Sequence, residues 1–197
     1  MVNGSEHRVR TFNARRGRRS VLTDARLLTL LPGYAVPPAV LAPPGAPGRP
    51  ECVVLEVGCG HGAAALAYAA ATPEAHIVAL DVHPPGVARM VAAVDAAGLS
   101  NLSAELADAV EFLAERVPQG ALDAVHLFFP DPWPKTRHHR RRFVSPDTLE
   151  LLAMRLTPAG RVLVATDSPD YAAYVRVVVA AHGGFVVRDA ARPTWRP

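Results

Sequence analysis

From residue 51 onwards, short apolar segments alternate with longer segments in which apolar side chains recur at helical spacing. Short segments that are apolar throughout are typical of strands buried on both faces. We expect strands at 52–57, 76–81, 102–107, 122–129, 161–166 and 185–188. We expect helices between them at 63–71, 85–97, 108–116, 146–156 and 170–181. This alternation predicts a doubly wound, mostly parallel sheet of the α/β class, with helices on both faces.

The first 50 residues follow a different pattern. Residues 1–19 are polar and rich in arginine, and residues 20–28 show helical spacing. Residues 32–50 contain seven of the nineteen prolines, which excludes a helix interior and predicts a stiff linker. We therefore divide the chain into a basic arm with a short helix and linker, 1–50, and one domain, 51–197.

Charge is distributed unevenly along the chain. Residues 1–50 carry eight arginines against two acids, whereas residues 51–197 carry thirteen basic against sixteen acidic side chains. Such asymmetry indicates a polyanionic partner for part of the surface, and a solvated basic tail is the alternative. All but one of the 21 basic residues are arginine, so the single lysine, Lys135, points to a position where a compact ammonium is needed.

The cysteines and the hydropathy pattern bear on the cellular compartment. Cys52 and Cys59 lie near either end of one short apolar segment. If this segment is a strand, they are too far apart for a disulfide, and no metal-ligand spacing occurs. No apolar run approaches ~18 residues, and no apolar segment follows the basic N-terminus. We expect a reduced, cytoplasmic protein with no membrane span and no metal, present as a monomer or a weak homodimer.

Three glycines alternate with other residues in Glu56-Val57-Gly58-Cys59-Gly60-His61-Gly62, after the first expected strand. Such a turn lets the backbone approach a ligand, and its spacing differs from the dinucleotide motif G-x-G-x-x-G. Glu56 would repel a phosphate but could pair with a cationic group. Asp81 ends the second strand, where an acid suits ribose hydroxyls. Asp108 follows the third strand and either accepts from an adenine amino group or caps a helix. S-adenosylmethionine fits this description, and NAD fits poorly.

A second constellation, Pro130-Asp131-Pro132-Trp133, follows the fourth expected strand. The prolines fix the backbone on both sides of Asp131, which restricts its carboxylate. Trp133 either offers a face for base stacking or packs on the core. A dense group of basic side chains comes next: Lys135, Arg137, His138, His139, Arg140, Arg141 and Arg142. A cluster of like charges favours a phosphate-bearing partner. We therefore expect Asp131 to face the reacting groups and the cations to bind a nucleic acid.

Taken together, these motifs resemble those of the bacterial tRNA (guanine-N7)-methyltransferases. The resemblance covers nearly the whole chain and is most specific at 128–142. It also rests on 55–62, 82–87, 165–167 and 11–18. It implies a Rossmann-like class I methyltransferase fold and methylation at N7 of guanine 46 in the variable loop of tRNA, with S-adenosylmethionine as the cofactor.

The resemblance also assigns roles by position. It implies that the cofactor is bound by Glu56, Gly58, Gly60, Asp81, Asp108 and Asp131. Asp131 would also be the catalytic residue, and Lys135 and Asp167 would contact the substrate. The residues implied to contact the RNA are Arg137, His138, His139, Arg140, Arg141 and Arg142.

Two departures from the family pattern stand out. The family usually has Glu where this chain has Asp81, and the shorter acid should still reach a ribose. The family's terminal T-x-F-E motif is absent, and the chain stops at Pro193-Thr194-Trp195-Arg196-Pro197, so we expect the last C-terminal strand to be missing. Two alternatives therefore stay open: a non-catalytic tRNA-binding protein, and a methyltransferase for another substrate.

Overall fold

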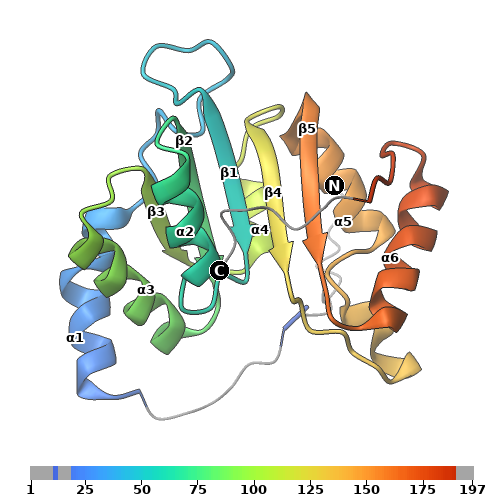
Figure 1. Ribbon diagram of the computed structural model, residues 1–197, viewed down its shortest axis with the longest axis horizontal. Helices are drawn as coiled ribbons and strands as arrows, with labels where there is room; N and C mark the ends of the chain where they lie inside the picture. Colours follow the sequence, from blue (N-terminus) through green and yellow to red (C-terminus); the bar gives the residue numbers. More distant parts are fainter. Residues whose placement is uncertain (1–10, 13–18, 190–197) are drawn as a thin grey trace, which may run out of the picture.

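The computed structural model describes residues 11–12 and 19–189, and in this part of the chain five strands form one parallel sheet (Figure 1). The strands lie in the order β3-β2-β1-β4-β5. Their bounds are β1 Cys52–Val57, β2 Ala75–Asp81, β3 Leu102–Leu106, β4 Leu122–Phe128 and β5 Leu156–Ala165. The strand order reverses direction after β1, which is the doubly wound arrangement that the alternating pattern predicted.

Helices connect the strands, and four of the six described helices begin at a residue whose side chain caps the first backbone N–H groups. The helices are α1 Val21–Thr29, α2 Ala63–Ala71, α3 Pro84–Ala97, α4 Ala109–Glu115, α5 Pro146–Arg155 and α6 Pro169–His182, with short 3-10 turns η1 Leu31–Tyr34 and η2 Thr136–Arg141. The side chains of Ser20, Asp108, Ser145 and Ser168 accept hydrogen bonds from the first turns of α1, α4, α5 and α6. Within the described ranges, no helix is both long and apolar enough to cross a bilayer.

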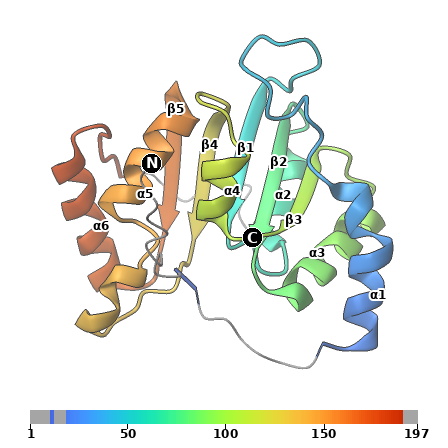
Figure 2. The same cartoon turned by 180° about the vertical axis from the view of Figure 1, so that it is seen from behind.

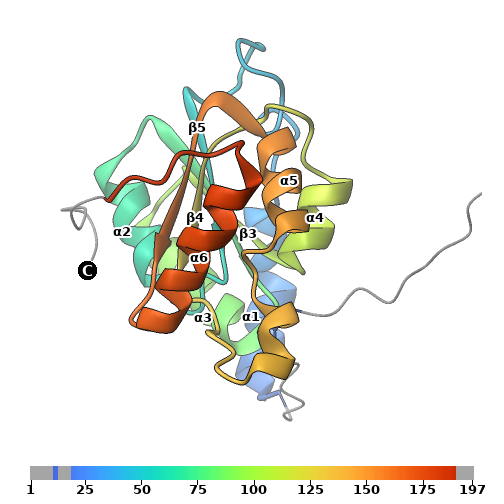
Figure 3. The same ribbon diagram turned by 90° about the vertical axis from the view of Figure 1, so that its right-hand side faces the viewer.

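The sheet separates two hydrophobic cores. Ile77 and Ala79 of β2 belong to the core under α2 and α3, whereas Val78 and Leu80 belong to the core under α4, α5 and α6. Figure 2 shows α4 and α5 in front of the sheet, and Figure 3 shows α2 on the opposite side from them. Burial of successive β2 residues on opposite faces explains why this segment is apolar throughout rather than alternating.

The segment before β1 packs against this domain. Helix α1 contacts α3, and the hydroxyl of Tyr34 donates to Asp95 of α3 at 3.0 Å. Val40 and Leu41, from the proline-rich stretch, are buried in the core under α4 and α5. The guanidinium of Arg49 pairs with Asp123 at 2.7 Å and anchors the end of the stretch beside β4. The proline-rich segment is therefore fixed at the N-terminal ends of the strands.

Two strand predictions differ from the structure by more than one residue at an end. Residues 185–188 were predicted as a strand, and this is wrong: they have no regular structure, and Val186 is 82% exposed. The reason is that no described strand lies beside this short apolar run. Strand β5 begins at Leu156 rather than 161, because Leu156 pairs with Leu122 before an irregularity shifts the register to Ala124 with Arg161. The expectation for 193–197 lies outside the described residues.

Candidate functional site

The parallel register brings the predicted acids to one edge of the sheet. Val57 pairs with Leu80 and with Leu127, and Phe128 pairs with Ala165, so the carboxyl ends of β1, β2, β4 and β5 lie level. The segments that follow these ends carry the glycine turn, Asp81, Asp131 and Asp167. Ligands of doubly wound sheets bind at this edge, beside the point where strand order reverses.

The glycine turn is held against the end of β2 by backbone hydrogen bonds. The N–H groups of Gly58 and Cys59 both donate to the carbonyl oxygen of Leu80, at 2.8 and 2.9 Å. Gly58 and Gly60 have φ of 71° and 58°, which side chains with a Cβ rarely adopt. These hydrogen bonds fix the turn in place, and at its glycines the backbone is not covered by a side chain.

Asp81 anchors this turn directly. One carboxylate oxygen accepts from the N–H of Gly60 and the other from the N–H of His83, both at 2.7 Å. A carboxylate oxygen has more than one lone pair, so both can still accept from a ligand hydroxyl. The short acid thus shapes the glycine turn and lines the cavity next to it.

Glu56 precedes the glycine turn, and Cys59 lies within it, between Gly58 and Gly60. Glu56 is 3% exposed, so a carboxylate is buried one residue before the end of β1. Burial, together with the charges of Asp81 and Glu56, raises the pKa of the Cys59 thiol well above its usual value. Cys59 therefore stays protonated and is not a thiolate nucleophile.

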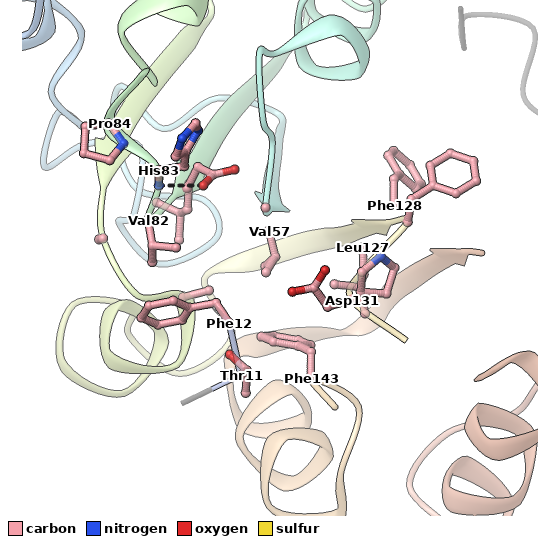
Figure 4. Close-up of a pocket in the computed structure, with 17 residues that line it drawn as sticks. Thr11, Phe12, Val57, Val82, His83, Pro84, Leu127, Phe128, Asp131 and Phe143 are labelled. Atoms are coloured by element: carbon pink, nitrogen blue, oxygen red, sulfur yellow. Dashed lines mark hydrogen bonds between the residues drawn. The ribbon is translucent and has the colours of Figure 1, made fainter. Parts of the chain in front are cut away.

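A cavity of about 540 Å³ opens at this edge. The residues that line it come from the glycine turn, the ends of β2 and β4, and the N-terminal arm. Figure 4 shows the Asp131 carboxylate directed into the cavity between Val57 and Phe143, with Phe12 across from it. Carboxylates and apolar surface line the same space, a combination that suits a ligand with hydroxyl, amino and cationic groups.

A smaller cavity of about 280 Å³ adjoins the first and shares Phe12, Val82 and Ala107 with it. Asp108 and Glu111 supply its acidic side chains. Asp108 is also the N-cap of α4, because its carboxylate accepts from the N–H of Val110 at 2.8 Å. The helix-cap alternative for Asp108 is therefore confirmed, and the same residue faces a cavity where an amino group could bind.

The turn that carries Asp131 has an unusual backbone. Phe129 and Trp133 have φ of 50° and 44°, positions that non-glycine residues rarely occupy. Such conformations persist when the surroundings fix them, and they concentrate at functional sites. The indole of Trp133 is 8% exposed, and its N–H donates to the carbonyl of Thr11 at 3.4 Å. Trp133 is therefore buried, but its contacts are with Thr11 of the arm and with His138 and Arg141 of η2, and it belongs to neither core cluster of the described residues.

Most of the predicted cationic side chains lie on η2, at the surface beside this turn. Lys135, Arg137 and Arg140 are exposed. The guanidinium of Arg141 lies 5.0 Å from the centre of the Trp133 ring. Partial desolvation, together with the neighbouring cations, lowers the pKa of His138. The positive charge of this surface therefore comes from the arginines and the lysine.

Two residues of the basic run lie inward rather than outward. His139 is half-buried, with its ring 6.2 Å from that of Tyr174. Arg142 is 1% exposed, and its Nε donates to the carbonyl of Pro132 at 2.9 Å. RNA contact was expected at Arg142, but burial of its guanidinium corrects this expectation, because a phosphate cannot reach a group enclosed by protein.

The predicted residues are brought together only in part. Gly58, Asp81 and Asp131 line the larger cavity, whereas Glu56, Gly60, Lys135 and Asp167 are not among its lining residues. Asp167 is exposed in the loop between β5 and α6, at the same edge of the sheet. It therefore lies on the side from which a large substrate would approach.

Two residues that line or shape the site were not predicted from the sequence. Phe12 lines both cavities, although the sequence analysis assigned no site residue to the arm. Gly86, in the first turn of α3, packs so closely on the glycine turn that an added Cβ would lie 2.7 Å from the carbonyl oxygen of Gly60. Its signal in the sequence is a glycine inside a helix, which usually has a packing reason.

Comparison with known proteins gives a consistent result. A family model described as "Putative methyltransferase" matches residues 50–194. The chain is 41% identical over 179 residues to a tRNA (guanine-N(7)-)-methyltransferase of Halorhodospira halophila, which covers 89% of this chain and 78% of the relative. It is 37% identical over 208 residues to the protein of the same name from Nitrosospira multiformis, with 100% and 89% covered.

Two solved structures with a similar fold carry the name of a methyltransferase. One is a precorrin-6y C5,15-methyltransferase from Geobacter metallireducens, with a TM-score of 0.53 and 17% identity over 67% of this chain and 62% of that one. Another is a 16S rRNA methyltransferase, with a TM-score of 0.50 and 22% identity over 67% of this chain and 68% of that one. At these identities, the likeness establishes a class I Rossmann-like fold.

Proposed function

Since the chain belongs to the tRNA (guanine-N7)-methyltransferase family, we propose that the atom it methylates is N7 of guanine 46, in the variable loop of tRNA. The observation that carries the proposal is the turn at 130–133. It directs the Asp131 carboxylate into the cavity and leads immediately into the exposed cations of η2. One segment thereby joins an acid at the reaction site to a surface suited to RNA phosphates.

The methyl donor is S-adenosylmethionine, and the polar groups of the site are complementary to those of this cofactor. Its ribose hydroxyls and adenine amino group are hydrogen-bond donors, and the cavities present acceptors: Asp81 in the larger one and Asp108 in the smaller. The concave glycine turn leaves room for a ligand to approach the backbone. We propose that Glu56, Gly58, Gly60, Asp81, Asp108 and Asp131 hold the cofactor. When bound, it supplies a methyl group already activated by a sulfonium.

Asp131 has two tasks in this proposal. Guanine N7 carries a lone pair and no proton, so the nucleophile needs no base. Methylation leaves the purine positively charged, and a fixed carboxylate at Asp131 stabilises that charge as it develops. Placing N7 in line with the methyl carbon accounts for much of the remaining catalysis, since effective molarity can contribute about 7 kcal/mol or more. Lys135 and Asp167, at the rim, orient the guanine.

The RNA is held by the cationic surface, in our proposal by Arg137, His138, Arg140 and Arg141 with part of the basic arm. His139 is less accessible to a phosphate, because its Nε2 is buried. Residues 1–50 would comprise the basic arm, the short helix and the proline-rich linker, and 51–197 the methyltransferase domain. A tRNA substrate also favours a cytoplasmic location and allows a monomer or a weak homodimer.

The proposal is tested by methyl transfer from labelled S-adenosylmethionine to an unmodified tRNA transcript, with the modified base mapped by N7-specific strand cleavage. A matched transcript with adenine at position 46 is the control. We expect label at guanine 46 and none in the control transcript. Equal label in both transcripts would contradict the assigned position. Tight tRNA binding without any transfer would instead favour a non-catalytic RNA-binding protein.

A further inference from the structure

Arg142 stands apart from the rest of the basic run because its charge is enclosed. Its side chain is 1% exposed, and both ends of the guanidinium are occupied. Nε donates to the carbonyl of Pro132 at 2.9 Å, and Nη2 forms an ion pair with Asp170 in the first turn of α6. Asp170 itself is 69% exposed, so only the arginine is withdrawn from water.

Two tyrosines of α6 form the surface on which this guanidinium rests. Its central carbon lies 4.5 Å from the ring centre of Tyr174 and 5.5 Å from that of Tyr171. The two rings are stacked with centroids 6.1 Å apart. The hydroxyl of Tyr171 accepts from the N–H of Val144, at 3.4 Å, so the same tyrosine also holds the chain that follows η2. The planar fork is thus fixed in position and direction.

Arg142 contacts the two segments that carry Asp131 and Asp167, the acids proposed to lie near the guanine. Pro132 directly follows Asp131, and Asp170 comes three residues after Asp167. Figure 1 shows the segment after β4 lying beneath the start of α6. At the sheet, the two segments are joined by the hydrogen bond from the N–H of Phe129 to the carbonyl of Ala165. Beyond the ends of the strands, they are joined by Arg142 and by the hydrogen bond from Val144 to Tyr171, and Arg142 is the buried ionic link among these contacts.

We propose that Arg142 is a positioning residue for methyl transfer. It fixes the Asp131 turn against the start of α6 and thereby sets the spacing of the Asp131 and Asp167 carboxylates. The inference rests on the proposed function in one respect: the reaction whose rate Arg142 affects is methyl transfer to tRNA. A catalytic group displaced by about 1 Å can lower a rate by roughly 100-fold, so a contact that sets this spacing acts on turnover rather than on RNA affinity.

The test replaces Arg142 with lysine, which keeps the charge but not the fork. A lysine ammonium cannot reach Pro132 and Asp170 with the geometry of a guanidinium. The matched control is Arg155→Lys. Arg155 also holds backbone carbonyls, those of Leu113 and Ala114, but from the C-terminal end of α5, which precedes β5 at the opposite edge of the sheet.

Three quantities are measured for each variant: kcat, KM for tRNA, and the acrylamide quenching of Trp133 fluorescence, in a Trp195→Phe background so that Trp133 alone emits. For Arg142→Lys, we expect kcat to fall at least tenfold, KM to change less than threefold, and quenching to rise. For Arg155→Lys, we expect all three to match the parent. A wild-type kcat in Arg142→Lys, or a fall in kcat no larger than that of Arg155→Lys, would overturn the inference.

A second variant covers the case in which Arg142→Lys does not fold. Asp170→Asn alters the exposed partner only and keeps an oxygen acceptor. We expect kcat to fall two- to fivefold with KM unchanged, and a wild-type kcat would overturn the inference. If the parent chain transfers no methyl group to tRNA, the proposed function fails. The quenching comparison then decides whether Arg142 fixes the turn: higher quenching in either variant supports that part, and unchanged quenching refutes it.

Discussion

Replacing Gly86 with alanine tests the packing that shapes the cofactor site. Gly86 lies in the first turn of α3 and is buried against the glycine turn. The added Cβ would lie 2.7 Å from the carbonyl oxygen of Gly60, whereas ordinary contacts begin at 3.4 Å. The turn and the helix must therefore separate by about 0.7 Å, and the neighbour that must move is backbone.

Two opposing effects set the magnitude. Gly→Ala in an unstrained helix position stabilises a protein by about 0.4–1 kcal/mol. Forcing an extra methyl group into a filled space costs about 1–3 kcal/mol. The second effect is larger here, so we expect a net cost of about 1–2 kcal/mol. Because the displaced carbonyl belongs to the turn that receives the cofactor, the cost should be seen in cofactor binding, as a Kd raised about 5- to 30-fold.

Calorimetric titration with S-adenosylmethionine measures this Kd, and urea unfolding measures stability. Gly33→Ala is the matched control, because an added Cβ at Gly33 has no heavy atom within 4 Å. We expect the control to bind the cofactor like the parent. If Gly86→Ala also binds with the parent's Kd, the glycine turn does not form the cofactor wall, and our reasoning about the site is refuted.

The remaining predictions concern the acids, the cations and one buried histidine. Asp131→Asn should lower kcat about 100-fold with cofactor Kd changed less than threefold; equal losses would make Asp131 a binding residue only. Asp108→Ala should cost about 1 kcal/mol of stability and also weaken cofactor binding, whereas Ser145→Ala should lose a helix cap without changing Kd. Arg140→Gln should weaken tRNA binding and reduce the slope of log K against log salt by about one; an unchanged slope would exclude phosphate contact. Burial lowers the pKa of His126 from 6.5 to about 4. The contribution of the neutral, buried imidazole to the free energy of unfolding is therefore complete above pH 6.5 and is lost as pH falls towards 4. Between pH 7 and 4.5, wild type should lose about 2 kcal/mol more unfolding free energy than His126→Gln in urea titrations.

Much of the scaffold could be predicted from the sequence because each element is encoded locally. The helix at 63–71 and the strand at 52–57 have the predicted bounds, since apolar runs, caps and glycines lie within or next to them. The edge at which Asp81 and Asp131 meet follows from parallel topology alone. The strand predicted at 185–188 failed because a strand also needs a neighbour, and that information is not local.

The contacts that shape the site depend on residues far apart in the sequence. Arg142 is one of six basic or histidine side chains in 137–142, and nothing within the run distinguishes it. Its burial depends on Asp170, Tyr171 and Tyr174, roughly thirty residues later. The position of Phe12 in both cavities likewise results from tertiary packing; the family motif at 11–18 includes this residue but does not indicate which cavity it lines.

The most direct test of the central claim compares two tRNAs that differ by one atom of the target base. One carries guanine at position 46 and the other 7-deazaguanine, which has carbon in place of N7. Single-turnover methyl transfer is measured with saturating protein and labelled S-adenosylmethionine. We predict rapid transfer to the first tRNA and none to the second, with equal binding of both. Transfer to both at similar rates would mean that another atom is methylated, and would contradict the account.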